Sequence, residues 1–198
     1  MKKTDTILSL ITGEGVAWLF ILMARAAGRE IGLLTWVLPV FLPLLALFCL
    51  WVSYLLGKKY LFIFQLAKFL LIGVFFALFD LAILNSLMAY FGITKGKGYL
   101  FFVSISFVIV TAVKYIADKY WAFEKREKTK MGVEFSRFFI ITLVSWGIQV
   151  GIASLVVNSI GVQFGLPALV WANIGKILGV AVASIWNFIG YKFIVFKK

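Results

Sequence analysis

Ionisable side chains that interrupt long apolar stretches are the residues of this chain most able to do chemistry. Asp80 lies near the middle of one such stretch, and Lys114 and Lys176 lie about two turns from the ends of two others. A charge at the centre of a membrane-spanning helix costs about 2.5–3.5 kcal/mol, so it normally faces a protein interior or a hydrated cavity. We therefore expect all three side chains to point inward.

Amide side chains accompany these charges at helical spacing. Asn173 and Asn187 nearly share one face of the last apolar stretch with Lys176, and Gln149 belongs to a shorter polar stripe in the stretch before it. Each of these two stretches thus has a polar seam. Their other faces carry small residues at four-residue intervals, which we expect to allow close helix approach: Gly147 and Gly151, and Gly175, Gly179 and Ala183. The candidate binding residues are Asp80, Lys114, Gln149, Asn173, Lys176 and Asn187.

Three hypotheses account for the seams. In the first, they only hydrogen-bond helix to helix, and Lys114 or Lys176 neutralises Asp80 as a structural pair. In the second, they line a polar groove through which an anionic headgroup passes or docks, because the two lysines attract its phosphate. In the third, Asp80 or Glu14 is the titrating carboxylate of a proton-coupled exporter.

The elements that position these residues are membrane-spanning helices. The chain has 198 residues, of which 63% are apolar and 18% aromatic, so it has too little polar surface to coat a soluble globule. About 20 consecutive apolar residues cross the hydrocarbon layer as a helix. Five stretches are long enough: 33–56, 69–91, 99–121, 138–160 and 168–193.

A sixth stretch, residues 7–24, is also long enough, although two glycines flank Glu14 near its start and weaken it. We expect a sixth transmembrane helix here. Two alternatives stay open. The stretch lies on the membrane surface, or it is a cleaved signal peptide, because a basic start and small residues around Arg25 fit that pattern.

Beyond residue 66 the chain contains two similar segments. KYIADKYWAF, from Lys114, shares three identical positions with NFIGYKFIVF, from Asn187, and KFLLIG from Lys68 matches RFFIIT from Arg137. Each copy contains two spans, so both copies start on the same side of the membrane. The predicted fold is therefore an all-α integral membrane protein with a four-helix core of two parallel two-helix repeats. The predicted parts are an N-terminal pair of helices in residues 1–66 and a domain in residues 67–198, with repeats at 68–123 and 137–196.

The charge distribution indicates topology rather than nucleic-acid binding. The formal net charge is +12, and with six spans most lysines and arginines fall on the side that holds both termini. We therefore expect a multi-pass protein of the plasma or inner membrane with both termini in the cytoplasm. Trp121, Tyr99 and Tyr191 lie near the ends of spans, where aromatic rings commonly anchor in the headgroup region.

The residue types also exclude several activities. The chain has no histidine, and Cys49 is its only cysteine, so the commonest metal ligand and general base are missing and no internal disulfide can form. It has no phosphate-binding glycine loop and no paired acidic metal motif. We predict no catalytic residue, no metal, no cofactor and no enzymatic activity.

Three segments of the chain resemble the GtrA-like family, which includes GtrA and the transmembrane domain of dolichol-phosphate-mannose synthase. They are FLLIGVFFALFDLAILN from Phe69, KYIADKYWAF from Lys114, and ANIGKILGVAVASIWNFIGYKFIVF from Ala172. The resemblance covers residues 67–198, and the matching positions include Gly73, Asp80, Asn85, Lys176, Asn187, Phe188, Lys192 and Phe196. One departure is Lys114, which stands where the family pattern has an asparagine.

The resemblance implies a membrane protein of cell-surface polysaccharide or glycolipid synthesis that works on polyprenyl-phosphate-linked sugars. We expect it to help translocate such a lipid, as a flippase does, with Lys114 and Lys176 attracting the phosphate. Gln149, Asn173 and Asn187 would then hydrogen-bond the sugar. The alternative is a non-catalytic anchor or scaffold for a cytoplasmic glycosyltransferase that docks on the basic loop from Lys125 to Lys130. Membrane lipid is a partner in either case, and a homodimer fits because so few helices enclose little volume.

Overall fold

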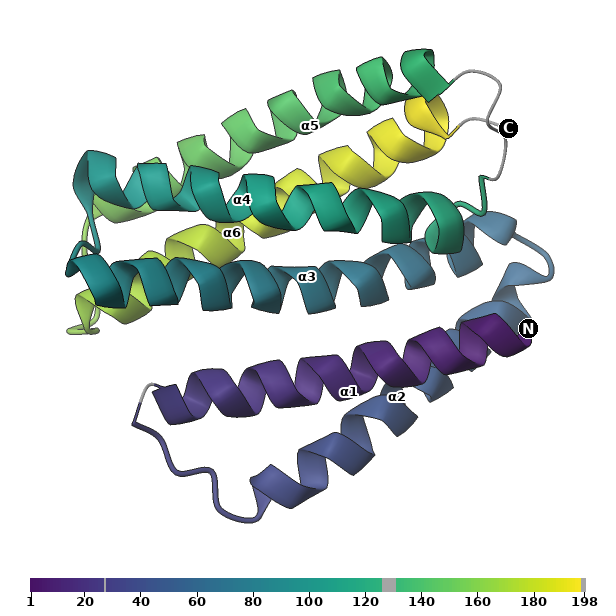
Figure 1. The fold of residues 1–198 in the computed structure, drawn as a ribbon, viewed down its shortest axis with the longest axis horizontal. Helices are drawn as coiled ribbons and strands as arrows, with labels where there is room; N and C mark the ends of the chain where they lie inside the picture. Colours follow the sequence, from purple (N-terminus) through teal and green to yellow (C-terminus); the bar gives the residue numbers. More distant parts are fainter. Residues whose placement is uncertain (27, 126–130, 197–198) are drawn as a thin grey trace. The chain divides into compact units, whose positions relative to one another are not determined.

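The structure is entirely helical over the residues that it describes. It is a computed structural model that describes residues 1–26, 28–125 and 131–196, with 86% helix and no strand among them (Figure 1). Hydrocarbon offers no hydrogen-bond partner to the backbone, so continuous helices satisfy the peptide groups within each span. The predicted all-α membrane fold is confirmed.

Six helices of the described chain are long and apolar enough to cross a membrane, and the first of them includes the stretch that carries Glu14. They are α1 (Lys3–Ala26), α2 (Leu34–Gly57), α3 (Leu61–Phe91), α4 (Gly96–Ala117), α5 (Met131–Ser154) and α6 (Ala168–Gly190). Three of them continue into π-helical turns: Asp118–Ala122 after α4, Leu155–Ile160 after α5, and Tyr191–Val195 after α6.

Helix α3 begins earlier than the sequence predicts. It starts at Leu61 instead of Phe69, because the apolar residues of LFIFQLA continue the helix backwards. The helix therefore crosses the predicted domain boundary at residue 66 without a break. Helix α5 likewise starts earlier, at Met131 instead of residue 138, and residues 126–130, which belong to the predicted basic loop, lie outside the described residues.

The chain forms two compact units. One contains Met1–Ala82 and Ile116–Glu124, and the other contains Ile83–Tyr115 and the described part of Lys125–Lys198. Helices α3 and α4 each contribute to both. The predicted division into residues 1–66 and 67–198 stays a prediction.

In the first unit, α1 packs closely along α2 (Figure 1). A Cβ atom at Gly13 would lie only 2.5 Å from Cα of Pro43, so glycine permits this approach. Small residues let helices come together in lipid, where the gain is in van der Waals packing. The buried positions of α1 recur every fourth residue: Asp5, Ser9, Gly13, Ala17 and Ile21.

In the second unit, α5 and α6 lie side by side through the glycines of α6 (Figure 1). A Cβ atom at Gly179 would lie 2.7 Å from the backbone oxygen of Gln149, and one at Gly175 would lie 2.6 Å from Val157. The predicted close approach at these two glycines is confirmed. Gly147 and Gly151 of α5 were expected to act in the same way, but no described atom lies within 4 Å of a Cβ built there.

The two similar chain endings have the same local structure. Each has a five-residue π-helical turn at matching positions, Asp118–Ala122 and Tyr191–Val195. Each turn is closed by the same backbone bond, from Phe123 to Asp118 at 2.9 Å and from Phe196 to Tyr191 at 2.7 Å. This agreement concerns the endings alone, and the organisation of the whole core into repeats stays a prediction.

The Gly179 contact yields a stability prediction. Gly179→Ala should destabilise the folded protein by about 1–3 kcal/mol, because the new methyl group meets backbone that cannot rotate away. The matched control is Gly151→Ala on the facing helix, which adds the same methyl group in open space and should be neutral or slightly stabilising. Thermal unfolding in detergent measures both, and equal effects would contradict the packing described here.

Candidate functional site

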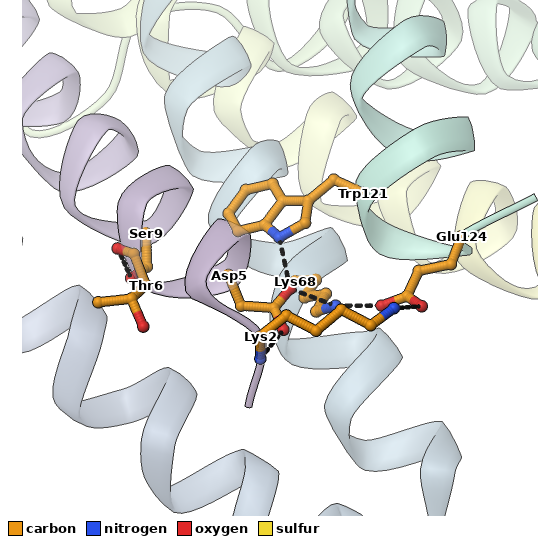
Figure 2. A network of polar contacts seen from close by, with 7 residues as sticks. All are labelled: Lys2, Asp5, Thr6, Ser9, Lys68, Trp121 and Glu124. Carbon is orange, nitrogen blue, oxygen red and sulfur yellow. Dashed lines mark hydrogen bonds and ion pairs between the residues drawn. The ribbon is translucent and has the colours of Figure 1, made fainter.

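A buried ion network surrounds Lys68 in the first unit (Figure 2). We call it the Lys68 network, and its members are Lys2, Asp5, Lys68, Trp121 and Glu124. The Lys68 side chain is 1% exposed, and its Nζ lies 2.7 Å from Oδ1 of Asp5 and 2.8 Å from Oε1 of Glu124. The indole of Trp121 donates to the same Asp5 oxygen at 3.2 Å, and the Lys2 ammonium pairs with the other Glu124 oxygen.

Three segments that are far apart in the sequence converge at this network. Asp5 lies in the first turn of α1 and accepts the backbone N–H of Lys2 at 3.0 Å. Lys68 lies in α3, and Glu124 follows the π-helical turn after α4, with a φ of +49° that non-glycine residues rarely adopt. The network therefore fastens the N-terminal helix to α3 and to the segment that follows α4.

The electrostatics of Glu124 follow from its two lysine neighbours. Burial alone would raise the pKa of its carboxyl. Hydrogen bonds from Lys2 and Lys68, with the charges of both lysines, outweigh that effect and lower the pKa from 4.5 to about 2. The carboxylate is thus held in its ionised form.

Lys176 is the most deeply buried of the predicted binding residues. Its side chain is 0% exposed in the second unit. The ammonium donates to the backbone oxygen of Val103 at 3.3 Å and to the hydroxyl of Ser106 at 3.2 Å, both on α4. Tyr99, one turn earlier on α4, donates to the oxygen of Ala172 at 2.8 Å. The N-terminal half of α6 is thus joined to α4 through a cation and two hydroxyl groups.

Lys114 lies near the other end of the second unit, among aromatic rings. Its ammonium lies 5.7 Å from the centroid of Tyr191, and the Tyr191 hydroxyl is 3.2 Å from that of Thr142. The neighbouring Tyr115 donates to the buried carboxylate of Glu134 at 2.9 Å. Lys114 and Lys176 therefore lie on different helices in different surroundings.

The predicted amides fall in two groups. Asn187 donates to the hydroxyl of Ser145 at 2.9 Å, so it does link α6 to α5. Gln149 is 2% exposed, at the point where α5 meets Gly179. The side-chain oxygens of Asn173 and Asn187 are buried and accept no hydrogen bond from the described residues. A second hydrogen bond between helices joins α5 to α4, because the indole N–H of Trp146 donates to the hydroxyl of Ser104 at 3.0 Å.

Asp80 is buried, as an intramembrane charge requires, with 4% of its surface exposed. It belongs to the first unit, whereas Lys114 and Lys176 belong to the second. Its predicted pairing with either lysine stays a prediction. The inward orientation expected for Asp80 and Lys176 is confirmed by their burial.

Glu14, the carboxylate of the exporter hypothesis, lies beside a shallow hollow in the first unit. The hollow has a volume of about 320 Å³ and is lined by Leu10, Ile11, Glu14 and Pro43. Trp18, one turn further along α1, donates to Glu14 at 2.7 Å. The carboxylate is thus engaged by its own helix.

Sequence reasoning missed the Lys68 network and misjudged three aromatic residues. Trp121, Tyr99 and Tyr191 were expected to anchor in headgroups, but they are 7%, 0% and 2% exposed and bond inside the protein. Asp5 and Glu124 were not singled out, because each lies at a span end where a charge is ordinary. The available signal was Lys68 itself, a lysine at the start of an apolar stretch with no acid nearby in the sequence.

The described residues contain no group of three or more His, Cys, Asp or Glu side chains that could hold a metal ion. What they do contain is a set of six apolar helices with charges turned inward. Such a chain is a multi-pass membrane protein.

Comparison with known families identifies the chain more closely. Residues 68–196 match the family described as the GtrA/DPMS transmembrane domain, and the chain belongs to that family. The matched region begins at Lys68 and ends at Phe196, so it leaves out α1 and α2. No curated protein and no solved structure matches the chain.

The family indicates the general setting of the protein. Its membership suggests a membrane protein connected with glycosyl carrier lipids in polysaccharide synthesis, and its members are generally non-catalytic. The resemblance drawn from the sequence is thus confirmed.

The Lys68 network yields a prediction about charge removal. Asp5→Asn should destabilise the folded protein by about 3 kcal/mol, because breaking a buried ion pair leaves an uncompensated charge. The double variant Asp5→Leu/Lys68→Met should recover much of that loss, since apolar residues can replace a buried pair. Glu30→Gln removes an exposed carboxylate and serves as the control. Thermal unfolding in detergent measures all three, and a double variant less stable than Asp5→Asn would contradict the pairing.

The lowered pKa of Glu124 yields a prediction about pH. Because its folded-state pKa is below the unfolded value, its stabilising contribution is complete above about pH 4.5 and is lost as the pH falls toward about 2. The stability difference between the wild type and Glu124→Gln should therefore be constant near neutral pH and shrink in that acid range. Unfolding midpoints over a pH series measure it. A difference that stays constant down to about pH 3 would rule out this linkage.

Proposed function

We propose that the protein helps a polyprenyl-phosphate-linked sugar to cross the membrane in cell-surface polysaccharide or glycolipid synthesis. The observation that carries the proposal is the fully buried Lys176 in the matched domain, whose ammonium is held by Val103 and Ser106. A charge at that depth costs free energy and is normally retained for a partner or a transported group. Lysine is a common phosphate-binding residue.

The remaining candidate residues have assigned roles in this proposal. Lys114 and Lys176 attract the phosphate, and Asp80 stays a candidate binding residue of the first unit. Gln149, Asn173 and Asn187 offer hydrogen bonds to the sugar. The protein lies in the plasma or inner membrane with both termini in the cytoplasm, because lysine and arginine concentrate on that side.

A second function is favoured by the hydrogen bonds within the seam. Asn187 binds Ser145, and Trp146 binds Ser104, so part of the predicted groove holds helices together. In that function the protein is a non-catalytic scaffold for a cytoplasmic glycosyltransferase, with docking on the basic loop. Of that loop, from Lys125 to Lys130, the structure describes only Lys125.

Reconstitution separates the two functions. Vesicles that contain the purified protein should expose a labelled polyprenyl-phosphate-sugar on the far leaflet faster than protein-free vesicles. Lys176→Met should slow that rate by roughly tenfold to a hundredfold, because a hydrogen bond to a charged group contributes about 1.5–3 kcal/mol. Lys97→Ala, which removes an exposed lysine, is the control.

The controls also identify the opposite result. Lys176→Met must unfold cooperatively at a temperature close to that of the wild type, which shows that it is folded. Lys176→Arg should retain part of the translocation activity because it keeps the charge. Equal rates with and without the protein would refute translocation and support the scaffold. Co-purification of a glycosyltransferase that is insensitive to Lys176→Met would then be the expected finding.

A further inference from the structure

Three asparagine side-chain oxygens in the second unit lack a hydrogen bond from the described residues: those of Asn85, Asn173 and Asn187. Asn187 already binds Ser145 through its amide nitrogen, so Asn85 and Asn173 are the stronger candidates for a ligand. The side-chain oxygens of Asn85 on α3 and Asn173 on α6 are buried, and neither accepts a hydrogen bond from the described residues. Such oxygens are rare in native proteins, and when they occur a water molecule or a ligand usually supplies the donor. The cost is highest inside a membrane, where lipid offers no donor.

Both asparagines flank one buried core. Asn85 follows Leu84 and Asn173 follows Ala172, and both of these neighbours belong to a cluster with Tyr99 and Val103. Lys176, which donates to Val103, lies three residues after Asn173, on the same side of α6. A buried cation and two open acceptors thus lie around the same part of the second unit.

The chemistry of these groups defines what they can bind. A lysine ammonium attracts an anion, whereas a carbonyl oxygen repels anionic oxygens and needs an O–H or N–H donor. Two open acceptors near a phosphate-seeking cation therefore fit a ligand that has an anionic group and neighbouring hydroxyl groups. A glycosyl phosphate has both.

We propose that Asn85 and Asn173 recognise the sugar, by accepting hydrogen bonds from its hydroxyl groups while Lys176 holds the phosphate. The inference rests on the proposed function and adds to it Asn85 as a sugar ligand and a basis for preferring the sugar-bearing lipid. Lys176 contributes to the binding of every polyprenyl phosphate. The two asparagines decide whether a sugar-bearing lipid binds better than the bare one.

A binding comparison tests these separate roles. The full chain in nanodiscs is titrated with polyprenyl-phosphate-glucose and with bare polyprenyl phosphate. The wild type should prefer the glucosylated lipid, and Asn85→Leu or Asn173→Leu should each reduce that preference by about threefold to tenfold, the effect of one lost hydrogen bond. Affinity for the bare lipid should stay the same. Lys176→Met should weaken the binding of both lipids by a similar factor.

Control variants protect the test against simple misfolding. Gln163→Leu removes an exposed amide from the loop before α6 and should leave the preference unchanged. Asn85→Ala and Asn173→Ala remove the acceptor without adding a large apolar side chain, and should lower the preference as the leucine variants do. Each variant is compared at a temperature below its own unfolding midpoint.

The outcomes separate this inference from the proposed function. A preference that is unchanged in all four asparagine variants, or equal binding of both lipids by the wild type, would overturn the inference. Translocation by the wild type in vesicles can persist in that case. If translocation is absent but the preference depends on Asn85 and Asn173, the proposed function fails and the recognition of the sugar stands.

Discussion

Hydrocarbon solvates neither charges nor hydrogen-bonding groups, and the structure of this protein depends on that constraint. A polar group placed within a span must meet its partner inside the protein, because the surrounding lipid supplies none. Lys68 meets Asp5 and Glu124, and Lys176 meets Val103 and Ser106. These contacts join segments that the sequence separates widely, and they do so more specifically than apolar contacts in lipid can.

The same constraint shows that the N-terminal helices contribute to the packing of the first unit. The family region begins at Lys68 and excludes α1 and α2, so they look like an addition to a complete domain. Lys68, however, shares its charge with Asp5 of α1. Removing α1 would leave a lysine whose environment was built around two carboxylates. The added helices are thus part of the first unit rather than a separate attachment.

Much of the fold could be predicted from the sequence, because span length and apolar composition are local properties. The five stretches from residue 33 onward are all helices, and the stretch around Glu14 is one too. The errors in the prediction concern residues near the ends of the spans. Helix α3 starts at Leu61, since a basic and aromatic segment can still continue a helix, and Trp121 and Tyr191 are buried although ring type and position favoured anchoring. A residue near a span end has lipid, water and protein within reach, and composition cannot choose among them.

The sequence likewise predicted one part of the candidate site and not the other. The inward position of Asp80 and Lys176 followed from the cost of a charge in lipid, and the close approach at Gly175 and Gly179 followed from their spacing. The sequence did not predict which residue each of these groups contacts. Gly147 and Gly151 have the same spacing, but no described atom lies within 4 Å of a Cβ at either position. Asn85 was a matching family position and not a predicted binding residue, and only the structure shows that its oxygen is buried without a donor.

The sequence by itself therefore determined that the chain is a bundle of membrane helices, which family its larger part belongs to, and which charges must turn inward. Only the tertiary structure decided that Asp5, Trp121 and Glu124 enclose Lys68, and that Ser106 receives Lys176. The physical reason is that the cost of burying a group depends on that group alone. The contact that offsets this burial cost depends on how helices that are far apart in the sequence pack together.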